Sequence, residues 1–222
     1  MERNQVMKNV VLIGATGFVG SAVLNELLER GHQVTAVVRN VAKLPKHEHL
    51  IAVEADVADV DRIADIARGK DAVISAYHPG WTNPDIAHLI KTNSPKIVEA
   101  AKKSGVGRLL MVGGAGVLFV KPGLRVVDSG AIPQEIMSTV RTLGDFYLNI
   151  LAKEDGIDWA FFAPAGEFDT DGKRTGSYRL GKEDLIVDTN GKSHISVQDY
   201  AKAMVDELEV PVHHKELFTI GY

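Results

Sequence analysis

The stretch Val10-Val11-Leu12-Ile13-Gly14-Ala15-Thr16-Gly17-Phe18-Val19-Gly20 decides how this chain folds. A continuous run of aliphatic residues, as in a buried parallel strand, ends in three glycines spaced three apart. An amphipathic segment follows at once, with apolar residues at positions 22–24, 27 and 28. We therefore predict a strand, a tight turn and a helix. The N-terminus of that helix offers free N–H groups and a partial positive charge, which suit a pyrophosphate.

Each of the three glycines is expected to meet a different steric demand. Gly14 lets the chain turn off the strand, Gly17 lets backbone N–H groups approach a ligand, and Gly20 lets the helix pack closely on the strand. Glycines are common in turns, so the triplet alone is a weak signal. The strand before it and the helix after it favour a phosphate-binding turn over the alternative, a βα turn that binds nothing.

The segment from Gly14 to Gly20 resembles the G-x-x-G-x-x-G signature of extended and atypical short-chain dehydrogenases/reductases. Together with later features, it makes nearly the whole chain similar to the compact atypical group that includes NmrA-like proteins and NADH-flavin reductases, often labelled NAD-dependent epimerase/dehydratase-like. The resemblance implies an α/β fold: a Rossmann-like doubly wound parallel sheet with a small C-terminal α+β extension. It implies a single NAD(P)-binding domain over residues 1–222, in which 165–222 form a substrate-side extension.

Composition limits the possible functions. The 222 residues suffice for one domain with a sizeable core, and a net charge of −4 offers no basic patch for nucleic acid or an anionic membrane. Without cysteine, disulfides and thiolate chemistry are excluded, and the histidines show no metal-ligand spacing, so no metal is expected. No apolar run is long enough to span a bilayer, and Met1–Lys8 lacks the apolar segment of a signal peptide. We expect a cytoplasmic monomer or homodimer with a small-molecule substrate.

The ends of the second and third predicted strands (33–38 and 50–53) bear on the choice of cofactor. In a doubly wound fold the residue after the second strand faces the adenosine ribose, and here it is Arg39 with no acid beside it. A guanidinium there favours NADP(H) over NAD(H), although a solvated surface arginine is the alternative. The resemblance places Asp56 and Val57 against adenine. Asp56 or Asp59 could instead cap the predicted helix 60–67.

The ends of the fourth and fifth predicted strands (71–75 and 108–112) are expected near the nicotinamide half of the cofactor. Ser75-Ala76-Tyr77 ends the fourth strand and leads into a loop with Trp81, which is either a substrate platform or an anchor that packs the loop on the body. Gly113-Gly114 follow the fifth strand, where better-known relatives carry a catalytic Ser or Thr. We interpret these glycines as room for a flat ring.

The helix predicted over 135–153 lacks the Tyr-x-x-x-Lys pair of better-known relatives, because Tyr147 is followed four residues later by Leu151. Arg141-x-x-x-Asp145 resembles the Lys-x-x-x-Glu of the atypical group, so Arg141 is expected at the ribose or a phosphate; a surface ion pair is the alternative. An irregular flap is expected over 117–133. Short strands are expected at 156–163, 174–180, 184–188 and 217–220, with a turn at 169–173 and a helix at 200–208 behind a Ser196–Asp199 capping box.

These predictions define a candidate site without an assigned catalytic residue. The residues expected to bind the dinucleotide are Gly14, Thr16, Gly17, Phe18, Val19, Gly20, Arg39, Asp56, Val57, Ser75, Ala76, Tyr77, Gly113, Arg141 and Pro164. The weaker substrate candidates are His78, Trp81, Gly114 and Asp128. The favoured function is hydride transfer from NADPH to a planar acceptor such as a flavin or quinone. The alternatives are an NmrA-like redox sensor without catalysis and, less favoured, a nucleotide-sugar epimerase/dehydratase.

Overall fold

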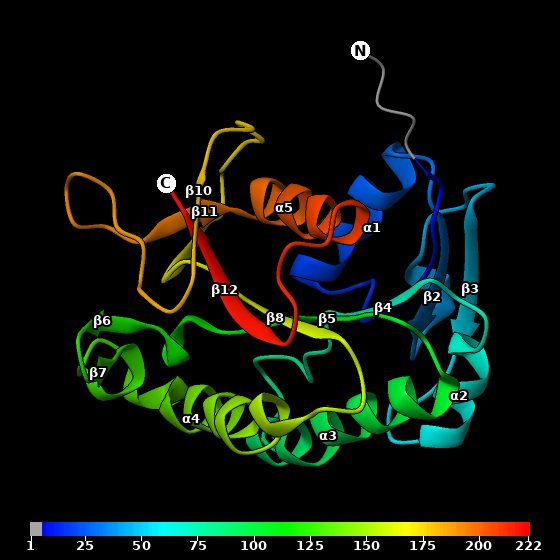
Figure 1. Ribbon diagram of the computed structural model, residues 1–222, viewed down its shortest axis with the longest axis horizontal. Coiled ribbons are helices and arrows are strands. Elements are labelled where there is room, and N and C mark those ends of the chain that lie inside the picture. The colour runs from blue at the N-terminus through cyan, green and yellow to red at the C-terminus, as the bar shows by residue number, and fades with distance from the viewer. Residues whose placement is uncertain (1–5) are drawn as a thin grey trace.

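The central sheet runs through the molecule in the strand order β10-β12-β8-β5-β4-β1-β2-β3 (Figure 1). The computed structural model describes residues 6–222, so residues 1–5 of the polar N-terminal stretch lie outside the described residues. The strands of this sheet are β1 (Asn9–Ile13), β2 (Gln33–Val38), β3 (Leu50–Glu54), β4 (Ala72–Ser75), β5 (Leu109–Val112), β8 (Trp159–Ala163), β10 (Arg179–Gly181) and β12 (Glu216–Gly221). All neighbours pair in parallel except β10 with β12. The strand order reverses between β1 and β4, so the predicted doubly wound α/β fold is confirmed.

Helices cover both faces of this sheet (Figure 1). The helices α1 (Phe18–Glu29) and α5 (Val197–Glu209) pack together on one face. The helices α2 (Val60–Ala67), α3 (Ile86–Ser104) and α4 (Gln134–Asn149) lie side by side on the other face. The strands inside the sheet therefore have two buried faces, which explains their near-continuous apolar runs, whereas the edge strands β3 and β10 contain no buried residue.

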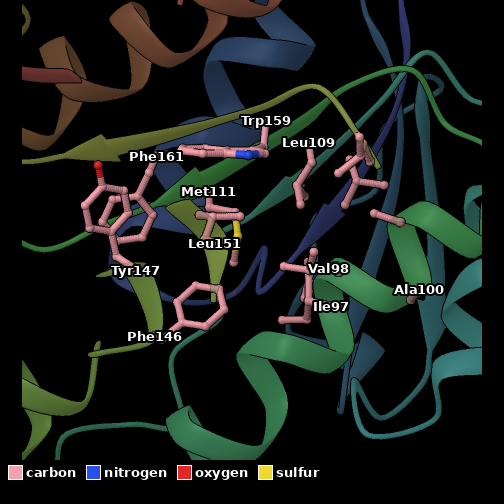
Figure 2. Close-up of a cluster of buried hydrophobic side chains, with 14 of the residues drawn as sticks. Ile97, Val98, Ala100, Leu109, Met111, Phe146, Tyr147, Leu151, Trp159 and Phe161 are labelled. Atoms are coloured by element: carbon pink, nitrogen blue, oxygen red, sulfur yellow. The ribbon is translucent and has the colours of Figure 1, made fainter. Parts of the chain in front are cut away.

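The side chains of the inner strands alternate between two hydrophobic cores. Val11 and Ile13 of β1 face the α2–α3–α4 side, whereas Val10 and Leu12 face the α1–α5 side. Figure 2 shows the former core, where the Tyr147 ring of α4 stacks on Phe161 with ring centroids 4.9 Å apart. Tyr147 is therefore a core residue.

Aromatic rings also organise the opposite core. Phe162 of β8 lies between Tyr200 of α5 and Phe218 of β12, with centroid distances of 4.2 and 4.1 Å. The Phe162 carbonyl oxygen accepts two hydrogen bonds, from the Tyr200 hydroxyl at 2.6 Å and from the Gly113 N–H at 2.7 Å. One backbone group thus connects α5 to the turn that follows β5.

The chain departs from the prediction in three segments outside the regular βα units. The segment 117–133 contains a hairpin, β6 (Phe119–Lys121) with β7 (Leu124–Arg125), where an irregular flap was expected. The α4 helix ends at Asn149, and Leu151–Lys153 form a separate 3-10 turn. The turn expected at 169–173 begins inside β9 (Glu167–Asp169), which pairs in parallel with β11 (His194–Ser196).

The strands predicted at 174–180 and 184–188 are wrong for most of their length, and Asp199 supplies a reason. Its buried carboxylate accepts hydrogen bonds from the backbone N–H groups of Thr175 and Gly176 and from the hydroxyls of Thr175 and Tyr222. These N–H groups are satisfied by a side chain, so they need no strand partner. Burial raises the pKa of Asp199, but the donors, Thr175 first, outweigh it and hold the pKa below its usual value. Ser196 caps α5 as predicted, through the Asp199 N–H at 3.1 Å.

Candidate functional site

A cavity of about 700 Å³ follows the ends of the parallel strands. Its walls include the segments directly after β1, β2, β3, β4, β5 and β8, together with one face each of α3 and α4. In open α/β sheets ligands bind outside the carboxyl ends of the strands, at the point where the strand order reverses. The volume lies in the range typical of small-molecule and cofactor sites.

The glycine turn after β1 has the geometry that the sequence predicts for Gly14 and Gly20. Gly14 has a φ of +83°, and an added Cβ there would lie 2.5 Å from the Ala76 carbonyl oxygen. An added Cβ at Gly20 would overlap the Gly14 carbonyl oxygen, so only glycine lets α1 approach the turn. At Gly17 an added Cβ would meet only the Gly14 oxygen, at 3.4 Å. No side chain caps α1 at Gly17, and no acidic residue stands in its first turn, so its N-terminus stays available to an anion.

Two cationic side chains line the cavity beyond β2. The exposed Arg39 was predicted from the sequence, whereas Lys43 was not. The Asn40 side chain accepts from the Ala42 N–H at 3.0 Å and so starts the 3-10 turn that carries Lys43. Asn40 was the signal in the sequence that could have found Lys43, because an Asn at this position predicts a turn directly after Arg39.

The region after β3 brings Asp56 and Val57 to the cavity, as predicted. Asp56 also fixes its own turn, because its Oδ1 accepts from the Ala58 N–H at 2.8 Å. Asp59 caps α2 by accepting from the Arg62 N–H at 3.0 Å. The capping role therefore belongs to Asp59, and Asp56 keeps one carboxylate oxygen for other partners.

The turn after β4 places Ala76 and Tyr77 in the cavity wall, but not Ser75. Ser75 is buried at the end of the strand, outside the cavity wall, and its hydroxyl accepts from the Tyr77 N–H at 3.4 Å. The Tyr77 phenol oxygen accepts from Asn93 Nδ2 at 2.8 Å. Burial raises the pKa of Tyr77 above its usual value, with a smaller contribution from Asp56, and outweighs the opposing effects of Asn93 and Arg39. The phenol therefore stays protonated at neutral pH.

The loop after Tyr77 forms one rim of the cavity. Trp81 is 62% exposed and packs on the His78 ring with centroids 4.6 Å apart, which favours a platform over an anchor that packs the loop on the body. His78 Nδ1 accepts from the Gly80 N–H at 3.2 Å, so the neutral ring carries its proton on Nε2. Desolvation lowers the pKa of His78 below its usual value.

Gly113 and Gly114 line the cavity after β5, but for a reason that differs from the prediction. An added Cβ at Gly113 would lie 2.5 Å from the Phe161 ring, and one at Gly114 would lie 3.0 Å from Leu143 Cδ2. An added Cβ at Gly116 would overlap Val140 Cγ1. These glycines therefore make room for the protein's own side chains, and they let α4 pack directly on the turn.

The face of α4 that lines the cavity excludes Arg141. Arg141 forms an exposed ion pair with Asp128 at 3.1 Å, and neither residue lines the cavity, so the structure does not support the cofactor role predicted for Arg141 or the substrate role predicted for Asp128. The cavity-facing residues follow helical spacing: Ile136, Thr139, Val140, Leu143 and Gly144. Thr139 and Leu143 have the spacing of a Tyr-x-x-x-Lys pair but cannot perform its acid–base chemistry.

The structure adds two residues of α3, Asn93 and Ser94, to the predicted site. They are polar, yet they lie on the buried face of a helix whose neighbours Ile90, Ile97 and Val98 belong to the core. Buried polar residues on an apolar helix face were the missed signal. Pro164 lines the cavity as predicted, with Gly166 and Phe168 beyond it. The Phe168 ring lies edge-on to Phe18 with centroids 5.6 Å apart.

Two further properties concern residues 6–222 as a whole. They contain no group of three or more His, Asp or Glu side chains arranged to hold a metal ion. None of their helices has the length and apolar character that crossing a membrane requires.

The fold and the glycine turn together define the class of Rossmann proteins that bind dinucleotides. The chain belongs to the NAD(P)H-binding family, because the sequence model of that family matches residues 14–211. This membership confirms the resemblance stated from the sequence.

Three relatives illustrate the membership. The "uncharacterized protein YwnB" of Bacillus subtilis is 40% identical over 211 residues, which cover 94% of this chain and 96% of that protein. A crystal structure of a "putative epimerase" from Bacteroides thetaiotaomicron is 55% identical, with a TM-score of 0.91 and 98% of both chains covered. A "putative NADH-flavin reductase" from Streptococcus pneumoniae is 33% identical, with a TM-score of 0.83, and the match covers 96% of this chain and 99% of that one.

Proposed function

We propose that this protein transfers hydride from NADPH to a planar acceptor such as a flavin or quinone. The observation that carries the proposal is that one cavity holds both a free helix N-terminus and a largely apolar α3–α4 wall, to which α4 contributes neither a tyrosine nor a lysine. Such a wall can position a flat ring but cannot relay protons to a ketone. The relative described as a "putative NADH-flavin reductase" supports the same reaction class.

In this proposal the protein binds and orients its two substrates. The N–H groups at the start of α1 hold the pyrophosphate, and Arg39 and Lys43 hold the 2′-phosphate of NADPH. The nicotinamide supplies the hydride, which brings two electrons and one proton to the acceptor, and solvent supplies the second proton. No ionised side chain is needed at the acceptor, so the absence of the tyrosine is tolerated.

The segment 165–222 contributes to the acceptor side in this proposal. Ala165, Gly166 and Phe168 line the cavity, and Phe168 contacts Phe18 of the glycine turn. Residues 1–222 then work as a single domain whose last part closes over the cofactor. A cytoplasmic location and a monomeric or homodimeric state remain predictions from the sequence.

An NmrA-like sensor is the second candidate function. The largely apolar α4 wall favours it, because a protein that only reads the NADPH/NADP⁺ ratio needs no acid–base pair. A nucleotide-sugar epimerase or dehydratase is less favoured, since α4 brings no Tyr-x-x-x-Lys pair to the cavity for the proton transfer of that chemistry.

One assay separates the first two functions. Purified protein is given NADPH or NADH with a flavin, a quinone or dichlorophenol-indophenol, and nucleotide oxidation is followed by absorbance. Turnover with NADPH supports the reductase. Tight NADPH binding without oxidation by any acceptor supports the sensor, and no binding of either nucleotide would contradict both.

The cofactor preference is tested by Arg39→Asp. The new carboxylate repels a 2′-phosphate and accepts a hydrogen bond from a 2′-hydroxyl, so NADPH affinity should fall at least about tenfold while NADH affinity is kept. Calorimetric titration with each nucleotide measures both. Unchanged affinity for both nucleotides would remove the preference for NADPH.

A further inference from the structure

The cavity contains three buried polar side chains whose hydrogen-bonding capacity the protein does not use. Asn93 and Ser94 of α3 are 7% and 4% exposed, and Thr139 of α4 is 5% exposed. Among residues 6–222, the hydroxyls of Ser94 and Thr139 have no hydrogen-bond partner, and Asn93 uses its Nδ2 on Tyr77 but leaves Oδ1 unpaired. The side-chain oxygens of Asn93, Ser94 and Thr139 are not among the fully enclosed unpaired atoms of residues 6–222, so they open onto the cavity, where a bound group can reach them. All three line the cavity, so a ligand is the natural partner.

Charge divides the cavity into two ends. Its lining contains two cationic residues, Arg39 and Lys43, and one carboxylate, Asp56, and all three follow β2 or β3. The wall formed by α3 and α4 contributes only apolar residues, Gly144 and the neutral Asn93, Ser94 and Thr139. Tyr77, which bonds Asn93, stays uncharged because burial raises the pKa of its phenol. An anionic group would find no counter-charge at this end, which makes its desolvation costly.

We propose that Asn93, Ser94 and Thr139 form the acceptor subsite, and that it selects an uncharged heteroaromatic ring that carries both a carbonyl and a ring N–H. Hydroxyls donate to carbonyl oxygens, and the free amide oxygen of Asn93 accepts from an N–H. The edge of a flavin ring offers both groups, whereas a quinone offers carbonyls alone and leaves the Asn93 oxygen unpaired. The proposal rests on the hydride-transfer function and narrows its acceptor.

Binding measurements test the subsite without depending on turnover. The complex of the protein with NADP⁺ is titrated calorimetrically with lumiflavin, which has no phosphate, with FMN and with menadione. We expect lumiflavin to bind at least about fivefold more tightly than menadione, because only lumiflavin can donate a ring N–H to the Asn93 oxygen and one neutral hydrogen bond contributes about that factor. FMN should bind within about threefold of lumiflavin, since no cation stands at this end to attract its phosphate.

Two variants and a matched control locate the subsite. Thr139→Val and Ser94→Ala should each weaken lumiflavin binding about fivefold and leave the NADP⁺ affinity unchanged. Thr139→Val should also keep the thermal midpoint of the wild type, because the hydroxyl it removes has no partner in the protein. Thr142→Val is the control on the same helix: its hydroxyl donates to the Ser138 carbonyl at 2.7 Å and does not line the cavity.

The possible results separate this inference from the proposed function. If both variants bind lumiflavin as the wild type does, or if they weaken NADP⁺ and lumiflavin equally, the subsite assignment is overturned while the function stands. If FMN binds ten times more tightly than lumiflavin, the inference that the subsite selects an uncharged ligand is overturned. Failure of the wild type to bind NADP⁺ would overturn both the function and the inference that rests on it.

Discussion

The two ends of the cavity offer a ligand different physical means of recognition. At the β2–β3 end, Arg39 and Asp56 are exposed on turns and act through charge. At the α3–α4 end, Ser94 and Thr139 are buried on helices and offer neutral hydrogen bonds. Charge acts over several ångströms and tolerates mobile loops, whereas a neutral hydrogen bond needs a rigid frame. The difference suggests that the first end captures the ligand and the second end discriminates.

The largest expected effect comes from a substitution in the glycine turn after β1, which adjoins the charged end. An added methyl group in Gly20→Ala would overlap the Gly14 carbonyl oxygen, so the turn must open. We expect a loss of about 3 kcal/mol in the free energy of unfolding and no measurable binding of NADPH. Urea denaturation and calorimetry measure the two effects.

Gly17→Ala provides the matched comparison for that variant. The added methyl group meets only the Gly14 oxygen at 3.4 Å, so the fold should keep its stability within about 1 kcal/mol. NADPH affinity should nevertheless fall about tenfold, because the methyl group stands where backbone N–H groups meet the pyrophosphate. Equal stability losses in both variants would contradict the different roles given to these glycines.

A second prediction sharpens the charged end with Lys43→Met. Removing one cation should weaken NADPH binding about fivefold to tenfold at low salt and leave NADH binding unchanged. The difference should shrink in 0.5 M salt (about a 4 Å screening length), since the side chain acts at an exposed site. Titrations at two ionic strengths measure this. An equal loss for NADH would place Lys43 at the pyrophosphate instead.

A third prediction introduces a charge at the uncharged α3–α4 end of the cavity and so tests its difference from the β2–β3 end. Leu143 lines the cavity one helical turn after Thr139. Leu143→Lys should increase the affinity of the NADP⁺ complex for FMN relative to lumiflavin by about fivefold, the value of one partly exposed ion pair. Leu143→Met controls for the altered shape. A ratio that does not move would show that the FMN phosphate lies away from α4.

The smallest predicted effect is a difference in pH response between the two ends. A phosphate monoester has a second pKa of about 6, so lowering the pH from 7.5 to 5.5 should weaken NADPH binding about threefold and leave NADH unchanged. Lumiflavin binding should stay constant from pH 6 to 9, because burial holds the pKa of Tyr77 above its usual value and the phenol remains neutral. Titration across this range checks both, and a drop in lumiflavin affinity near pH 8 would contradict the neutral state of Tyr77.

The sequence predicts the charged end better than the neutral end, and the cause is the range of the interactions. Gly14 and Gly20 act on atoms within a few residues, so their roles follow from the local strand–turn–helix pattern. The sequence pointed to Arg141 and not to Thr139, because both are polar positions on α4 and only the packing of this helix on Gly116 fixes which face meets the cavity. The local pattern predicts a strand over residues 174–178. It cannot reveal that the N–H groups of Thr175 and Gly176 bond instead to the Asp199 carboxylate of a distant helix. Motif spacing alone cannot reveal such contacts.

The carbonyl oxygen of Phe162 links the cavity wall to a helix on the opposite face of the sheet. It accepts from both the Tyr200 hydroxyl of α5 and the Gly113 N–H, so a change in the tilt of α5 would be passed to the turn whose next glycines, Gly114 and Gly116, pack against α4. Directed evolution toward new acceptors should consequently recover substitutions on α5, which no ligand would touch, alongside those at the cavity wall. Substitutions on the face of the sheet opposite α4 can therefore change which acceptor the cavity accepts.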